Sequence, residues 1–125
     1  MFIKVEYLYK NIIRGGLIME NLELIIFELV SNGGNAKGLA YEAIACSEKG
    51  QFEQAEALLK EANESLVAAH KVQTEMIQAE AAGKHHDVTV LFVHAQDHLM
   101  AAIEVCTMAE NLIHMNKRLY ELEHK

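Results

Sequence analysis

Residues 88–113 read VTVLFVHAQDHLMAAIEVCTMAENLI, and this stretch decides the fold. Its first six residues are β-branched or apolar and also suit a buried strand, which so short a run cannot distinguish from a helix. The run then continues with small and apolar residues at helical spacing, namely Ala95, Leu99, Ala102, Ile103, Cys106, Ala109, Leu112 and Ile113. We therefore predict one helix from Val88 to about Glu123, with Asp87 as its N-cap.

Two further helices are predicted on the N-terminal side of this stretch. One runs from about Glu20 to Lys49 and is ended by Gly50, and the next runs from Phe52 to Ala82 and is ended by Gly83. The chain contains no proline, so nothing in it removes an amide donor from a long helix. Because short loops join antiparallel neighbours, the predicted fold class is all-α, with three long antiparallel helices in an up-down-up bundle.

Gly33 and Gly34 lie inside the first predicted helix, where each glycine costs about 1 kcal/mol relative to alanine. Either the helix kinks at this point, or another backbone or a ligand approaches it closely. We favour close packing.

The predicted third helix has more apolar surface than one bundle can bury. Between Val88 and Ile103 it is apolar around much of its girth. One face packs within the bundle, so the remaining surface predicts self-association.

Composition and charge exclude several classes of function. The 125 residues suit one domain, and 18 acidic residues against 11 lysines and arginines give a net charge of −7. This charge argues against nucleic acid and against an anionic membrane surface as partners.

No stretch suits a membrane span, so we expect a cytoplasmic protein with no membrane insertion. Cys46 and Cys106 lack CxxC spacing and are expected to be buried thiols in a reducing compartment.

Residues 1–18 differ from the rest of the chain because they have no clean helical face. The sequence Arg-Gly-Gly-Leu-Ile at residues 14–18 can be encoded by a purine-rich ribosome-binding sequence and a spacer, directly before Met19. Our hypothesis is that residues 1–18 are an extension outside the native coding sequence and that the helical domain spans residues 19–125. An ordinary N-terminal extension is the alternative.

His94, Asp97 and His98 share one face of the third predicted helix. Ionisable groups are costly in an apolar stretch unless they are satisfied, which leaves three interpretations: a structural cluster, a metal site or covalent phosphoryl transfer. A di-metal site is disfavoured because the other helices offer no second ligand set. In phosphoryl transfer a neutral imidazole would be the nucleophile, with Gln96, His98 and Gln73 as orienting or donor groups. Asp97 would repel a phosphoryl group and suits a metal ligand or an interface residue better.

Several motifs along the chain resemble those of one known family. Residues 93–100, VHAQDHLM, resemble the signature of the enzyme IIA components of the bacterial phosphoenolpyruvate-dependent sugar phosphotransferase system (PTS), lactose/cellobiose class. Further matches are AHxxQT at residues 69–74, GxFxxA at 50–55, NGGNA at 32–36 and LAYEA at 39–43. The resemblance covers the chain from Met19 onward, which is then a PTS enzyme IIA three-helix domain. Gln51 departs from the pattern, since the family often has an aspartate there.

The resemblance implies both a function and an assembly. His94 would accept a phosphoryl group from phospho-HPr and pass it to a cysteine of a IIB component, with Gln96, His98 and Gln73 in support. The protein would be a homotrimer in which three copies of Asp97 share a divalent ion, Mg²⁺. The motif favours a cellobiose- or chitobiose-like β-linked disaccharide over lactose. The alternative is a non-enzymatic trimeric helical interaction protein with a structural metal site. His70 belongs to a matched motif and has either a packing role or one beside the active site.

Overall fold

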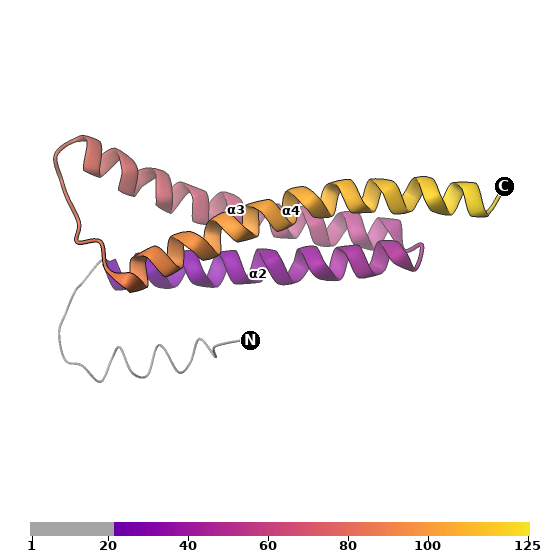
Figure 1. Cartoon of the computed structure of the whole chain (residues 1–125), viewed down its shortest axis with the longest axis horizontal. Coiled ribbons are helices and arrows are strands. Elements are labelled where there is room, and N and C mark those ends of the chain that lie inside the picture. Colours follow the sequence, from indigo (N-terminus) through magenta and orange to yellow (C-terminus); the bar gives the residue numbers. More distant parts are fainter. Residues whose placement is uncertain (1–21) are drawn as a thin grey trace, which may run out of the picture.

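A computed structural model describes residues 22–125, which form three long helices (Figure 1). Helix α2 spans Leu22–Glu48, α3 spans Phe52–Ala81 and α4 spans Val90–Glu123. No strand occurs in this part of the chain. The all-α prediction is confirmed. The proposed extension of residues 1–18 and the proposed start at Met19 lie outside the described residues and stay predictions.

The helices run up, down and up, as predicted. Helices α2 and α4 are parallel to each other, and α3 runs in the opposite direction (Figure 1). Helix α2 packs against both of the others, whereas α3 and α4 contact each other less. Towards the connection of residues 82–89, α3 turns away from α4 (Figure 1). Helix α2 therefore holds the bundle together at this end.

The core is rich in alanine, so the helices approach one another closely. One cluster of buried residues contains Ala36, Ala40, Ala43, Cys46, Ala55, Leu59, Ala62, Cys106, Ala109 and Ile113. The other contains Leu22, Ile26, Leu29, Ala69, Met76, Ala95 and Leu99. The two cysteines are buried free thiols, as expected. Burial raises the pKa of the Cys106 thiol, and the neighbouring Glu110 carboxylate raises it further.

The close approach predicted for the paired glycines is found at Gly33. A Cβ at this position would lie 3.5 Å from the carbonyl oxygen of His98 and 3.6 Å from the Cα of Leu99. A Cβ at Gly34 would meet nothing within 4 Å. Helix α2 continues without a break through both residues. Gly33 therefore brings the α2 backbone against α4 at the level of His98.

Both predicted glycine stops are confirmed, but the predicted start of the last helix is wrong. Gly50 and Gly83 have φ values of 77° and 88°, in the left-handed region that favours glycine. Helix α4 begins at Val90, and its N-cap is Thr89, whose Oγ1 accepts a hydrogen bond from the Phe92 amide at 3.1 Å. Asp87 is exposed and lies before the start of the helix. The cap forms at Thr89 because its extended backbone (φ −89°, ψ 161°) turns the hydroxyl toward the first turn.

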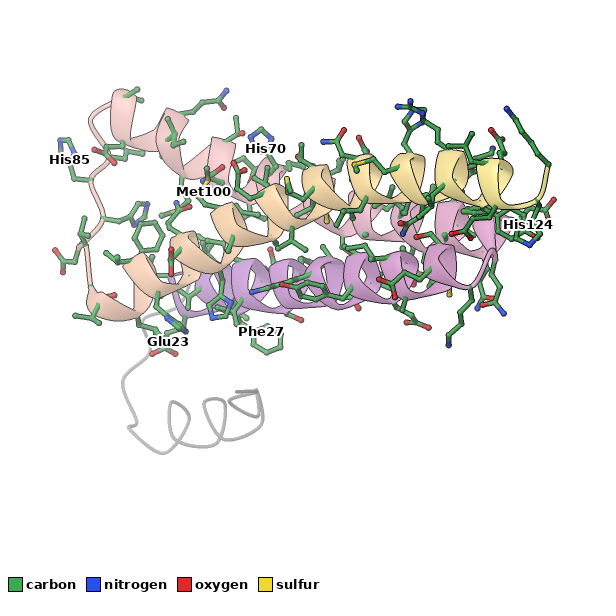
Figure 2. All side chains as sticks on the ribbon, turned by 45° about the vertical axis from the view of Figure 1, so that its right-hand side comes forward. Glu23, Phe27, His70, His85, Met100 and His124 are labelled. Atoms are coloured by element: carbon green, nitrogen blue, oxygen red, sulfur yellow. The ribbon has the colours of Figure 1, made fainter. Side chains whose placement is uncertain are left out.

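Aromatic rings close the end of the bundle where α4 finishes. The Tyr120 ring stacks on His124 at 3.9 Å between centroids and meets Phe52 edge to face at 5.5 Å. A Cβ on Gly50 would lie 2.8 Å from Cε2 of Tyr120. The turn between α2 and α3 is thus packed directly against the last turns of α4, and Figure 2 shows His124 at this end.

Candidate functional site

His94 and His98 occupy successive turns of α4 and point toward each other. Their Nε2 atoms lie 3.0 Å apart, and their rings are nearly perpendicular, at 83° with centroids 4.4 Å apart. Both side chains are half-buried. The predicted helical spacing therefore produces a direct hydrogen bond between the two imidazoles.

The charge state of His98 follows from its surroundings. Burial lowers its pKa, and the charges of His94 and Lys37 lower it further, while the Asp97 carboxylate acts in the opposite direction. A lowered pKa favours a neutral His98 ring at neutral pH. In the Nε2–Nε2 contact, one ring must carry the proton and the other must offer a lone pair. If His98 is the donor, the Nε2 of His94 is unprotonated.

Gln73 on α3 and Gln96 on α4 form a second hydrogen-bonded pair. The Nε2 of Gln73 donates to the Oε1 of Gln96 at 2.7 Å and lies 4.0 Å from the sulfur of Met100. Both glutamines are half-buried. Within residues 22–125, the amide NH₂ of Gln96 has no acceptor, so it remains available as a donor. The four residues predicted at the site thus form two pairs, and no hydrogen bond joins Gln73–Gln96 to His94–His98 in the described chain. Because Gln96 is two residues from each histidine, its side chain leaves α4 on a different side.

The other predicted residues lie outside the hydrogen bonds of this site. Asp97 is exposed. His70 is also exposed, and its carbonyl accepts a hydrogen bond from Thr74 Oγ1 at 2.9 Å, so the structure shows no buried packing role for its ring. In Figure 2, His70 and Met100 are seen on the side of the bundle where α3 and α4 diverge. Within the described chain, no three histidine, cysteine, aspartate or glutamate side chains are grouped to hold a metal ion.

The structure also brings to the site a residue that sequence reasoning missed. Lys37, on α2, is near enough for its charge to act on His98. The signal in the sequence is its position four residues after Gly33, on the same side of α2 as the contact with α4.

Asp97 belongs to an exposed apolar row along α4. The row continues in steps of three and four residues through Val90, Val93, Asp97, Ala101, Val105, Met108, Leu112, Met115, Leu119 and Leu122. Several members are more than half exposed, including Val90 at 88% and Met115 at 60%. No helix within residues 22–125 is long and apolar enough to cross a membrane. The surplus apolar surface predicted for this helix is therefore present on the single chain.

Comparisons with known proteins identify the family. A model of the family described as PTS system, lactose/cellobiose-specific IIA subunit, matches residues 24–117. The chain belongs to this family. It is therefore a IIA phosphocarrier component of a sugar phosphotransferase system, of the class that includes cellobiose, lactose and chitobiose proteins.

Relatives and solved structures of IIA proteins match nearly their full length. The chain is 45% identical to the lichenan-specific phosphotransferase enzyme IIA component of Bacillus subtilis, over 82% of this chain and 93% of the relative. The cellobiose-specific enzyme IIA of Bacillus anthracis has a TM-score of 0.79 and 41% identity, covering 82% of this chain and 94% of that one. A chain of the IIA(chitobiose)–HPr complex of Escherichia coli has a TM-score of 0.70 and 34% identity, covering 81% and 98%.

Proposed function

We propose that His94 is the residue that carries the phosphoryl group, receiving it from phospho-HPr and passing it to a cysteine of a IIB component. The observation that carries this proposal is the hydrogen bond between the Nε2 atoms of His94 and His98. With His98 as donor, the Nε2 lone pair of His94 is preserved for attack on phosphorus. The solved complex of an Escherichia coli relative with HPr supports the choice of donor.

In each transfer step one bond to phosphorus forms and one breaks. The Nε2 lone pair of His94 attacks phosphorus, and the P–N bond to the HPr histidine breaks with its electron pair returning to that nitrogen. In the second step the IIB thiolate attacks phosphorus, a P–S bond forms, and the Nε2 of His94 recovers its lone pair. Because His94 is half-buried, one side of the ring remains open to a partner protein.

The neighbours of His94 serve the phosphoryl oxygens. When the group arrives, the N–H of His98 is released from His94 Nε2 and donates to a phosphoryl oxygen. Gln96, whose Oε1 is held by Gln73 at 2.7 Å, and Gln73 itself are proposed as supporting residues, although on this chain the Gln96 side chain leaves α4 on a different side from His94. Asp97 is negatively charged and takes no part in binding this group.

Asp97 and the apolar row on α4 support a homotrimer. Three parallel α4 helices packed along this row would cover its exposed apolar side chains, including Met108, Met115 and Leu119. The three Asp97 carboxylates would then face one another, which is unfavourable unless they share a cation. Carboxylate oxygens suit Mg²⁺, so this donor set fits the proposed ion, which would neutralise the carboxylates at the axis.

The proposed carrier works in the cytoplasm for uptake of a β-linked disaccharide. Relatives named for lichenan and cellobiose are 45% and 42% identical, against 36% for a lactose-specific one, which supports a cellobiose-like sugar over lactose. The chitobiose-specific relative, at 35%, does not add to this preference. The VHAQDH motif at residues 93–98 gives the same preference.

Phosphorylation in a reconstituted system tests the role of His94. The protein is incubated with phosphoenolpyruvate, enzyme I and HPr, and an acid-labile, base-stable phosphate is expected. His94→Ala should abolish the label without changing the oligomer, whereas His114→Ala, an exposed histidine near the far end of α4, should keep it. Absence of label on the wild-type protein would favour the alternative, a non-enzymatic trimeric interaction protein with a structural metal site.

Light scattering tests the assembly separately. Met115→Glu should dissociate the trimer because it places a charge on the apolar row. Val67→Glu, at an exposed position of α3, should leave the trimer intact. Asp97→Leu should keep the trimer, since it exchanges repelling charges for apolar contacts. Dissociation of the trimer by chelators and by Asp97→Leu alike would instead show that the ion is structurally essential.

A further inference from the structure

Lys37 is a partly buried cation on α2. Its side chain is half-buried, although a lysine on a helix surface usually extends into water. Among residues 22–125, its ammonium group forms no ion pair or hydrogen bond. It is also the one lysine or arginine within α2, whose sequence from Leu22 to Glu48 holds no other. Its charge is therefore not used by the described fold.

The packing of α2 on α4 brings Lys37 to the histidine pair. Gly33 lies against the His98 backbone, at 3.5 Å from a Cβ position to the carbonyl oxygen. Lys37 follows one helical turn later on the same side of a helix that is parallel to α4. The charge of Lys37 lowers the pKa of His98, in keeping with this placement.

The surface of α2 beside Lys37 is open at Gly34. Gly34, which lies one turn before Lys37, is exposed, and a side chain there would meet nothing within 4 Å. The lysine stem is flexible, with a compact ammonium that binds phosphate oxygens as a point charge.

We propose that Lys37 is a phosphoryl-binding residue, whose ammonium moves onto the oxygens of the phosphoryl group on His94. The inference rests on the proposed phosphorylation of His94. The ammonium supplies what the neutral His98 ring lacks, because the N–H group of that ring carries no net positive charge against a dianion. The chain as a whole is acidic, with a net charge of −7, which makes a local cation more important for an incoming anion.

The test compares the rate of phosphoryl transfer from phospho-HPr to a set of Lys37 variants. Lys37→Gln and Lys37→Met remove the charge, and the second keeps most of the apolar stem. Both should slow transfer by about 10- to 100-fold, the range expected for losing one hydrogen bond to a charged group. Lys37→Arg should stay within about threefold of wild type, since it keeps a cation at the same position. Lys49→Gln is the matched control, because Lys49 is exposed and lies three turns away.

A spectroscopic readout separates phosphoryl binding from a structural role. The ³¹P resonance of the phosphohistidine should shift in Lys37→Gln and Lys37→Met but not in Lys49→Gln, while far-ultraviolet circular dichroism stays unchanged. Unaltered rate and resonance in both charge-removing variants would overturn the inference, as would an equal loss in Lys37→Arg. Failure of the wild-type protein to become labelled on His94 would refute the proposed function instead.

Discussion

Replacing Gly50 by alanine tests how tightly the turn between α2 and α3 packs against the last turns of α4. Gly50 has φ 77°, so any other residue there is strained, and its Cβ position lies 2.8 Å from the Tyr120 ring. Gly83 has a similar φ of 88°, but its Cβ position is in open space. The two glycines therefore share the backbone cost of alanine and differ in the ring contact.

The magnitudes follow from these two contributions. A left-handed alanine costs about 1–2 kcal/mol, which is the whole effect expected for Gly83→Ala. In Gly50→Ala the Tyr120 ring must also move, which weakens its contacts with Phe52 and His124. Each aromatic contact is worth about 0.5–1.5 kcal/mol, so Gly50→Ala should cost about 1–2 kcal/mol more than Gly83→Ala.

Urea unfolding followed by circular dichroism measures the difference. All variants are compared at one protein concentration, because self-association would make stability depend on concentration. In a Tyr120→Ala background the two glycine variants should cost the same, which completes a double-mutant cycle. Equal effects of the two substitutions in the wild-type background would refute the packing argument, and so would a difference that persists without the Tyr120 ring.

Three further predictions concern the helix that carries the histidines. Thr89→Ala should lower the free energy of unfolding by about 1 kcal/mol and speed amide exchange in the first turn of α4, whereas Asp87→Ala should change neither. Gly33→Ala should be tolerated, but Gly33→Leu should lower the urea midpoint by an amount equivalent to about 1–3 kcal/mol through overpacking against the His98 backbone, and an unchanged midpoint would contradict the close approach. Because the pKa of His98 is lowered in the folded state, the unfolded chain takes up the proton first, so its contribution to stability should be constant above its ordinary pKa of 6.5 and should fall as the pH drops below that value. Urea unfolding of wild type and His98→Gln should therefore diverge in pH slope only on the acidic side, and parallel slopes there would show that His98 is not shifted.

The sequence predicts the features that depend on local spacing. Helical periodicity places His94 and His98 one turn apart, and this spacing alone accounts for their contact. Gly50 and Gly83 are recognisable because few other residues adopt a left-handed conformation at the end of a helix.

Features that depend on register between helices could not be predicted in this way. The contact of Gln73 with Gln96 requires the alignment of α3 against α4, which the spacing of residues within one helix cannot supply. Lys37 was missed because its approach to His98 depends on the parallel packing of α2 and α4. The N-cap was misplaced for a different reason: Asp87 and Thr89 are both good capping residues, and the backbone conformation of the connection decides between them.

The two histidines owe their relative position to one continuous stretch of backbone. Since they lie on adjacent turns of α4, the amide hydrogen bonds of that helix keep the two side chains within reach of each other. A shift of α2 or α3, such as one caused by a docking protein, changes the surroundings of the pair without pulling it apart. A protein that must be recognised in turn by a donor and by an acceptor can thus deform at its surface and still present the same reacting atoms to both.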